Sequence, residues 1–198
     1  MMGDSGDRAV FLDRDGVLND DVHLITTPAQ FRILPGVPGA LRRVAEAGFH
    51  LIVISNQPVV ARGMVTEPEV DVLHEYLRSQ ISKQGGPRIE AFYYCPHHPN
   101  ADVERYRQDC ACRKPRPGMI RQAARDHGID LQASYMVGDR ITDIIAGSKA
   151  GCRTIQVATG KENDAPIQGT DLKDLETKPD HICDGLPAAV DWILEGGS

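Results

Sequence analysis

The sequence predicts an α/β protein of the Rossmann-like, doubly wound class, with a parallel sheet covered by helices on both faces. Short apolar runs rich in β-branched residues alternate along the chain with segments of helical periodicity. Several of these apolar runs end abruptly in polar residues, as strands do where a parallel sheet opens into functional loops. No internal repeat or linker divides the 198 residues. We therefore expect a single domain over residues 1–198, with right-handed crossovers between its strands.

The strands are predicted from buried-type apolar runs that are too short for helices. The first is Val10–Leu12, which leads into two aspartates and a glycine. The second is Phe49–Ile54, which ends in a polar cluster, and the third enters a cysteine-rich loop. The fourth runs into a Gly-Asp-Arg sequence, and the last is short. The expected strands after the first are residues 49–54, 89–94, 134–137, 153–157 and 181–183.

The helices are predicted from apolar spacing together with start and stop signals. Gly48 is placed to end the first helix, and Thr66–Glu69 has the form of a capping box. Pro117 suits a first helical turn, and Gly128 and Gly151 follow the ends of the next two helices. Helices are thus expected over about 37–47, 66–83, 117–127, 141–150 and 186–194. The polar stretches 20–32 and 159–180 are expected to be a flap and a surface excursion.

Composition narrows the class of partner. The net charge of −6 argues against nucleic acid, although basic residues gather locally and leave a small anionic substrate open. No run of 18 apolar residues is present, and the N-terminus lacks the apolar core of a secretion signal. A cytoplasmic protein with no membrane partner is the expectation, and nothing in the sequence requires more than a monomer.

Asp13 and Asp15 follow the first predicted strand and are separated by one residue. A carboxylate can attack phosphorus to form an aspartyl-phosphate, and a second carboxylate nearby can protonate the leaving oxygen and later activate water. Mg²⁺ prefers carboxylates together with substrate phosphate, which matches this pair. The alternative is a solvated turn, which the preceding buried strand and Gly16 disfavour.

Ser55 and Lys114 complete this set, because a hydroxyl and an ammonium can grip phosphoryl oxygens. Asn56 and Gln57 continue the polar cluster after the second strand and are candidate substrate contacts. A lone lysine on a loop is more often simply solvated. Lys114 is a candidate phosphate contact because it occurs together with the other motifs.

Asp139 ends the fourth predicted strand, and Asp143 lies one helical turn further on. Asp139 is a candidate Mg²⁺ ligand at the same sheet edge as Asp13. Asp143 could hold a water ligand or the loop, or it could serve as a helix cap or offset the helix dipole. The sequence leaves these readings of Asp143 open.

A second constellation combines Cys95, His97 and His98 with Cys110 and Cys112. Three thiolates and one imidazole form a closed structural zinc site, which would tie together the ends of the loop 95–112. Spacing does not decide which histidine binds. The alternative is a pair of unrelated reduced cysteine clusters.

These motifs, in their order and spacing, resemble the haloacid dehalogenase-type phosphatases. The resemblance rests on Asp13-x-Asp15-x-Val17, Ser55, Lys114 and Gly-Asp139-x-x-x-Asp143. It implies Asp13 as nucleophile, Asp15 as acid and base, and Ser55 and Lys114 as phosphate holders. It also implies Mg²⁺ bound by the Asp13 carboxylate, the Asp15 carbonyl and Asp139.

The cysteine-rich loop resembles a narrower branch, shared by histidinol-phosphate phosphatases and heptose-1,7-bisphosphate 7-phosphatases. Twelve residues separate His97 from Cys110, as in the heptose enzymes, and the resemblance favours His97 as the zinc ligand. Pro58 departs from the pattern, because it removes a backbone donor at the phosphate loop. The implied reaction is removal of the C7 phosphate of a heptose 1,7-bisphosphate, feeding nucleotide-activated heptose synthesis.

The chain leaves no room for a separate cap domain between the motifs, so loops must shape the pocket. Arg113 is the candidate for recognising the distal part of a small sugar bisphosphate, since a guanidinium binds phosphate bidentately. Arg62 is a second candidate, with a solvated loop position as the alternative. Two rival functions remain: a histidinol-phosphate or other sugar-phosphate phosphatase, and a zinc-stabilised binding module without catalysis.

Overall fold

The computed structural model describes residues 7–22, 24–160 and 174–197. Its centre is a sheet of six parallel strands in the order β3-β2-β1-β4-β5-β6. The doubly wound parallel fold is therefore confirmed. The strands are β1 (Arg8–Leu12), β2 (Phe49–Asn56), β3 (Ala91–Cys95), β4 (Tyr135–Gly138), β5 (Arg153–Val157) and β6 (His181–Cys183).

The strand order reverses between β1 and β4, and this is the feature that places the site. The chain winds outward from β1 through β2 to β3, and then returns to the other side of β1 to lay down β4. Leu12 lies opposite Val137 in the register, and the amide of Asp13 donates to the carbonyl of Val137 at 3.0 Å. In such sheets the crevice beyond the carboxyl ends at the reversal binds the ligand.

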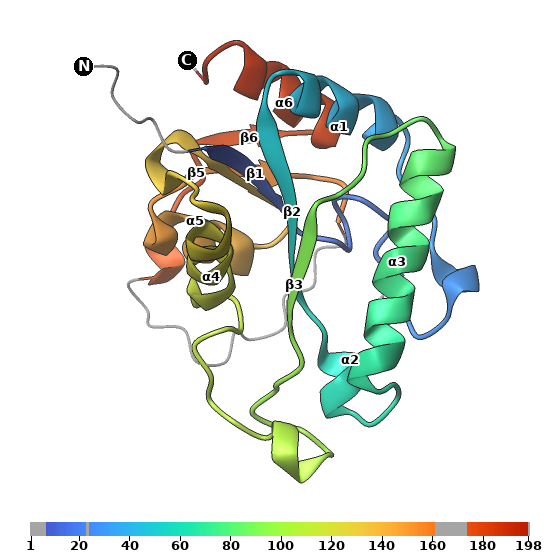
Figure 1. The fold of residues 1–198 in the computed structure, drawn as a ribbon. Helices are drawn as coiled ribbons and strands as arrows, with labels where there is room; N and C mark the ends of the chain where they lie inside the picture. The colour runs from blue at the N-terminus through green and yellow to red at the C-terminus, as the bar shows by residue number, and fades with distance from the viewer. Residues whose placement is uncertain (1–6, 23, 161–173, 198) are drawn as a thin grey trace.

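Both faces of the sheet are covered, as Figure 1 shows. Val10 and Leu12 point into a core with α1 (Val37–Glu46), α3 (Glu67–Lys83) and α6 (Leu186–Leu194). Ala9 and Phe11 point into a second core with α4 (Gly118–His127) and α5 (Ile141–Ala150). Alternate residues of β1 thus face opposite layers, which explains why the strand reads as continuously apolar.

Helix ends agree closely with the signals in the sequence. Thr66 and Glu69 form the predicted capping box, with the Thr66 amide donating to the Glu69 carboxylate at 2.7 Å. Gly128 and Gly151 close α4 and α5 in the left-handed conformation, with φ of 66° and 101°. Pro117 is the N-cap of α4 and not part of its first turn. The short α2 (Pro58–Ala61) was not expected, and it lies where a loop was predicted.

The predicted flap 20–32 is attached to the body of the protein. Its ends are joined by a hydrogen bond from the Asp20 amide to the Arg32 carbonyl at 2.8 Å. Ile25 and Phe31 are buried in the larger core, and a 3-10 turn spans Pro28–Gln30. Of the excursion predicted at 159–180, residues 161–173 lie outside the described residues.

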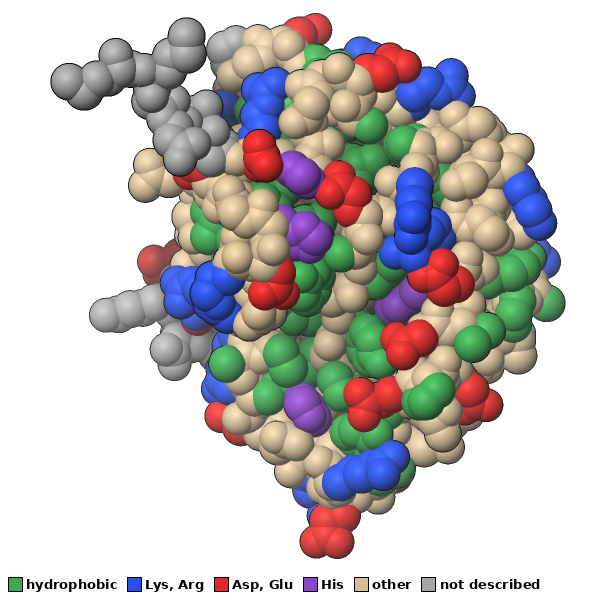
Figure 2. Space-filling view, in the orientation of Figure 1, with side chains coloured by type: hydrophobic (Ala, Val, Ile, Leu, Met, Phe, Trp, Pro, Cys, Tyr) green, Lys and Arg blue, Asp and Glu red, His purple; other side chains and the backbone are tan. Residues whose placement is uncertain are grey.

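Among the described residues, no helix is both long and apolar enough to cross a bilayer. On the face drawn in Figure 2, acidic and basic side chains are interspersed with apolar ones. That mixture agrees with a chain in which 25% of residues are charged and the net charge is −6.

Two helical glycines give a matched test of how closely α5 packs on the sheet. A Cβ on Gly147 would lie 2.6 Å from the Met136 Cβ and 2.8 Å from the Thr154 Cγ2, whereas a Cβ on Gly39 of α1 meets nothing within 4 Å. We expect Gly147→Ala to lower the free energy of unfolding by about 1–3 kcal/mol through overpacking. Gly39→Ala should raise it by roughly 0.5 kcal/mol. Denaturant titration measures both, and equal effects would contradict the close packing.

Candidate active site

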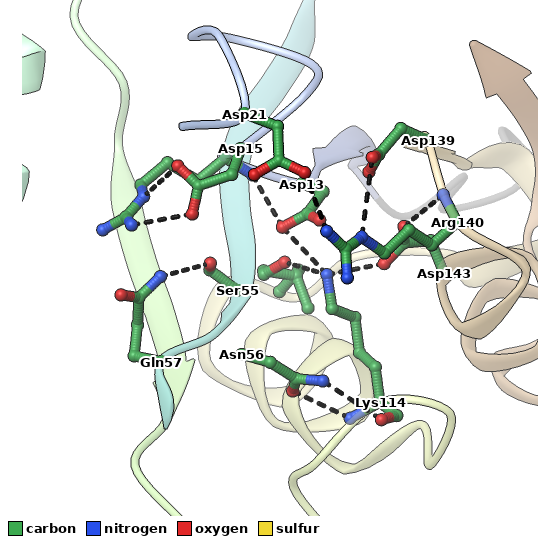
Figure 3. A network of polar contacts seen from close by, with 12 residues as sticks. Asp13, Asp15, Asp21, Ser55, Asn56, Gln57, Lys114, Asp139, Arg140 and Asp143 are labelled. Carbon is green, nitrogen blue, oxygen red and sulfur yellow. Dashed lines mark hydrogen bonds and ion pairs between the residues drawn. The ribbon is translucent and has the colours of Figure 1, made fainter. Parts of the chain in front are cut away.

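The predicted catalytic residues converge at the strand-order reversal, although they are spread over most of the chain. Asp13 follows β1, Ser55 lies near the end of β2, and Asp139 follows β4. Lys114 enters from the loop between β3 and α4. Figure 3 shows these side chains pointing toward a common space. The parallel direction of the strands brings their carboxyl ends to one edge, and this accounts for the convergence.

The Lys114 ammonium is the centre of the site's electrostatics. Its Nζ lies 2.9 Å from Asp13 Oδ1 and 2.6 Å from Asp143 Oδ1, and it donates to the Ile54 carbonyl at 2.9 Å. Only 3% of the residue is exposed. Burial alone would lower the pKa of Lys114, but Asp13 and Asp143 outweigh it and raise that pKa. The ammonium is therefore held charged beside the predicted nucleophile.

Asp143 has two functions, one structural and one in the site. Its Oδ2 accepts the Arg140 amide at 3.0 Å, which is the helix-capping interaction that the sequence left open. Its Oδ1 pairs with Lys114. A Cβ on Gly138 would lie 2.1 Å from the Asp143 Cβ, so only glycine lets Asp143 approach β4 this closely.

Asp139 carries the clearest sign of a cation site. Both carboxylate oxygens are buried, and within the described residues neither accepts a hydrogen bond. A Cβ on Gly16 or Gly160 would lie 2.6 Å or 1.9 Å from Asp139 Oδ2, so two glycines keep the space around this carboxylate clear. Arg140 is the nearest counter-ion, with Nε at 3.6 Å.

The carboxylates of Asp13, Asp139 and Asp143 offer ligand atoms that all lie within 4.8 Å of one another. Burial, followed by the charges of Asp143 and Asp13, raises the pKa of Asp139 to about 8. Burial likewise raises the pKa of Asp13 to about 6, although Lys114 opposes it. Such a cluster favours a bound cation, and an oxygen-only donor set suits Mg²⁺.

Asp15 is held apart from this cluster by its own cation. Its Oδ2 lies 2.7 Å from Arg14 Nη2, and its Oδ1 accepts from Arg14 Nε at 3.1 Å and Asn19 Nδ2 at 2.9 Å. Burial would raise the pKa of Asp15, but Arg14 and Asn19 overcome it and hold that pKa below its usual value. In Figure 3 the Asp15 carboxylate lies at the side of the site away from Asp139.

The polar cluster at the end of β2 holds other site residues in place. Gln57 Nε2 donates to Ser55 Oγ at 2.7 Å, and both side chains are buried. Asn56 Nδ2 donates to the Lys114 carbonyl at 3.1 Å, and its Oδ1 accepts the Lys114 amide at 3.0 Å. Asn56 and Gln57 thus position Lys114 and Ser55; their predicted substrate contacts stay predictions. Pro58 is in the first turn of α2, where an amide has no partner inside the helix.

The flap contributes an acidic residue that the sequence did not indicate. Asp21 is buried and pairs with the exposed Arg140, with Nη2 and Oδ2 at 2.8 Å. Arg140 directly follows Asp139, so this ion pair links the flap to the end of β4 (Figure 3).

Cys95, His97, Cys110 and Cys112 meet at one point, as the sequence led us to expect. Their ligand atoms lie within 4.8 Å of one another, with Sγ–Sγ distances of 3.0, 3.1 and 3.4 Å. A tetrahedral zinc ion holds its sulfur ligands about 3.8 Å apart, so a small expansion would accommodate it. His97 turns its Nδ1 toward Cys112 Sγ at 3.4 Å. The side-chain contact with Cys95 lowers the pKa of Cys112 to about 5, which favours a thiolate ligand.

Arg113 and Arg62 both lie near His98. In the sequence, Arg113 stands between the cysteine cluster and Lys114, and Arg62 stands between Ser55 and the cysteine cluster. Burial lowers the pKa of His98, and Arg113 and Arg62 lower it further. Arg113 Nη1 donates to the His97 carbonyl at 3.1 Å, which connects this guanidinium to the cysteine cluster.

Four residues of the site were missed by sequence reasoning: Arg14, Asn19, Asp21 and Arg140 as an ion-pair partner. Each acts through a contact with another side chain, and none belongs to a spacing pattern that reveals it. Arg14 had the one available signal, since it is a charged residue between two motif aspartates next to a buried strand.

Comparisons with known proteins agree with this geometry. A HAD-hydrolase-like family model matches residues 111–189. A D-glycero-β-D-manno-heptose-1,7-bisphosphate 7-phosphatase of Haemophilus ducreyi is 41% identical over 157 residues, which cover 79% of this chain and 86% of that protein. The Escherichia coli protein of the same name is 43% identical over 155 residues, which cover 77% of this chain and 80% of that one.

A solved structure also matches nearly the whole chain. It is a D,D-heptose 1,7-bisphosphate phosphatase from B. bronchiseptica complexed with magnesium and phosphate, with a TM-score of 0.78 and 32% identity. The match covers 96% of this chain and 99% of that one.

Fold and site together define a phosphoric monoester hydrolase of the haloacid dehalogenase-like class. Within that class, the chain belongs to the family of the D-glycero-β-D-manno-heptose-1,7-bisphosphate 7-phosphatases.

The buried Lys114 pairs give a test of the site's electrostatics. Lys114→Met would leave Asp13 and Asp143 buried without their cation, so we expect unfolding free energy in metal-free buffer to fall by about 3–5 kcal/mol. The control is Lys149→Met, which breaks an ion pair with Asp174 in which the lysine side chain is 40% exposed, and it should cost less than about 1 kcal/mol. Denaturant titration distinguishes the two, and similar losses would show that Lys114 is not electrostatically central.

Proposed function

We propose that this protein is a Mg²⁺-dependent phosphatase that removes the C7 phosphate of D-glycero-D-manno-heptose 1,7-bisphosphate and leaves heptose 1-phosphate. The observation that carries the proposal is the Asp13 carboxylate, paired with Lys114 at the strand-order reversal. The substrate is taken from relatives at 41–43% identity that are named for it, and their names specify the β anomer. The product then enters nucleotide-activated heptose synthesis.

Two carboxylates divide the chemistry. An Asp13 oxygen attacks phosphorus while the bond from phosphorus to the C7 oxygen breaks, and Asp15 gives that oxygen its proton. Asp15 then takes a proton from water as the water oxygen attacks phosphorus. The bond between Asp13 and phosphorus breaks, and inorganic phosphate leaves.

The remaining residues hold the phosphoryl group. The Lys114 ammonium and the Ser55 hydroxyl face the charge that develops on its oxygens. The Asp13 and Asp139 carboxylates and the Asp15 carbonyl would hold Mg²⁺, which when bound neutralises phosphoryl charge. The two buried oxygens of Asp139, which accept no hydrogen bond among the residues that the structure describes, support this assignment.

The cysteine cluster has a structural role in this proposal. Zinc bound by Cys95, His97, Cys110 and Cys112 would join the two ends of the inserted loop 95–112 within one phosphatase domain. The loop carries Arg113 at its end, and the position of Arg62 near His98 brings a second guanidinium to the same region. We assign these two arginines to the distal phosphate of the substrate.

Substrate and nucleophile are tested together by phosphate release from purified protein. We expect the highest kcat/KM with the β anomer of the heptose 1,7-bisphosphate, a lower value with the α anomer, and the lowest with histidinol phosphate. Asp13→Asn keeps the shape of the side chain but removes the nucleophilic oxygen, so phosphate release should be abolished. Asp191→Asn, at an exposed ion pair with Arg43, is the control. A preference for histidinol phosphate would reject the substrate, and an active Asp13→Asn variant would reject the covalent mechanism.

Zinc is tested by metal analysis and limited proteolysis. We expect one zinc ion per chain, and chelation or Cys110→Ser should make the loop 95–112 sensitive to protease, because the bound metal joins its ends. Cys183→Ser, outside the cluster, should retain zinc and protease resistance. Equal zinc content in the two variants would contradict the assigned ligand set.

A further inference from the structure

Arg14 is a fully buried guanidinium next to the active site, and the reaction described above gives it no task. It is 1% exposed and is the largest of the fully buried side chains. Burying a cation costs several kcal/mol per ion, and good geometry with a partner is needed to offset that cost. The ion-pair partner of Arg14 among the described residues is Asp15.

The geometry of this pair fixes the direction of the Asp15 carboxylate. Arg14 Nη2 and Nε lie 2.7 and 3.1 Å from the two different oxygens of Asp15. Two parallel hydrogen bonds set the plane of a carboxylate as well as its position. Asn19 Nδ2 adds a third donor at 2.9 Å. The Asp15 side chain is still 24% exposed, so it is not sealed off from solvent.

The Arg14 guanidinium also contacts residues of α3 and of the flap. Its Nη1 lies 3.4 Å from His74 Nε2, and its guanidinium carbon lies 5.6 Å from the Phe31 ring. Burial, together with the charge of Arg14, lowers the pKa of His74 to about 3, so its neutral ring can accept from the guanidinium. His74 stacks on Phe92 with centroids 4.6 Å apart and an angle of 11° between the rings. The position of the Arg14 guanidinium is therefore fixed by residues of α3, β3 and the flap.

The other cations of the site serve different carboxylates. Lys114 pairs with Asp13 and Asp143, and Arg140 pairs with Asp21 and Asp139. Arg14 thus acts on the one carboxylate to which the mechanism assigns proton transfer.

We propose that Arg14 and His74 are positioning residues for Asp15, and that they aim its carboxyl group at the oxygen of the leaving alcohol. The proposal rests on the proposed function, because it presupposes that Asp15 gives its proton to that oxygen. It adds that acid catalysis here depends on a relay of contacts from α3 through Arg14.

The test compares substrates whose leaving groups differ in how much they need protonation by Asp15. An alkoxide is a poor leaving group and needs Asp15 as acid, whereas 4-nitrophenolate leaves readily without protonation. For Arg14→Lys, which keeps the charge but loses the two parallel hydrogen bonds, we expect kcat/KM with alkyl and sugar phosphates to fall about 100-fold. The kcat/KM with 4-nitrophenyl phosphate should change less than about 3-fold, because kcat/KM reports formation of the aspartyl-phosphate and not the later step in which Asp15 acts as base for both substrates. An equal loss with both kinds of substrate, or no loss, would overturn the proposal.

Variants of His74 test the relay without touching Asp15 or its arginine. His74→Gln can still accept a hydrogen bond from Arg14, so it should behave nearly as the parent protein does. His74→Leu cannot, and we expect a loss of about 10-fold in kcat/KM that is confined to alkyl phosphates. The stability control is Leu77→Ala, a buried core change one turn along α3, which should lower the Tm without altering the ratio of alkyl to aryl kcat/KM. A ratio that follows Tm across all variants would count against positioning.

Failure of this proposal can be told from failure of the proposed function. A parent protein that hydrolyses aryl and simple alkyl phosphates but not the heptose bisphosphate would reject the substrate and leave the leaving-group comparison valid. Asp15→Asn should show the same selective loss as Arg14→Lys, to a greater degree. If Asp15→Asn lowers kcat/KM equally for both kinds of phosphate, the acid role of Asp15 and the positioning by Arg14 are both wrong.

Discussion

The Lys114 ammonium, buried between Asp13 and Asp143, is the interaction on which the site depends. Three carboxylates from the ends of β1, β4 and the first turn of α5 could not gather there without it, because like charges in a buried site repel strongly. Lys114 reaches this point because Asn56 clamps its backbone through two hydrogen bonds. One cation thus links β1, β2, the loop before α4 and α5 into a single rigid unit.

The charges of the site are sorted into pairs, and this sorting gives each aspartate a different character. Lys114 serves Asp13, Arg14 serves Asp15, and Arg140 connects Asp21 to the neighbourhood of Asp139. Arg14 and Asn19 hold the pKa of Asp15 low, whereas burial and the charges of Asp143 and Asp13 raise the pKa of Asp139 to about 8. A low pKa of Asp15 favours the ionised carboxylate. The cluster of Cys95, His97, Cys110 and Cys112 lies outside the catalytic centre. It brings Cys95 and Cys110 together from distant parts of a long loop.

Prediction from sequence succeeded where local chemistry decides structure. The strand Arg153–Val157, the helix Leu186–Leu194 and the capping box at Thr66 agree with the expectations, because apolar spacing and cap residues act over a few positions. The short α2 was missed, because a single turn of helix carries too little periodicity to be detected. Arg14 and Asp21 were missed for another reason. Each is defined by a partner side chain, and one sequence offers no way to see an ion pair such as Asp21 with Arg140, which are far apart along the chain.

The sequence by itself determined the fold class, the motif residues and their chemical types. Asp13, Asp15, Ser55 and Asp139 follow predicted strands, and Lys114 precedes a predicted helix. Only the tertiary structure decided how those residues are used. It showed that Asp143 both caps α5 and pairs with Lys114, and that Asn56 holds the backbone of Lys114. It also showed that, within the described residues, neither carboxylate oxygen of Asp139 accepts a hydrogen bond. The physical reason is that residue type and spacing set which groups arrive at a sheet edge. Their ionisation and direction depend on the contacts and burial that form only when separate layers pack together.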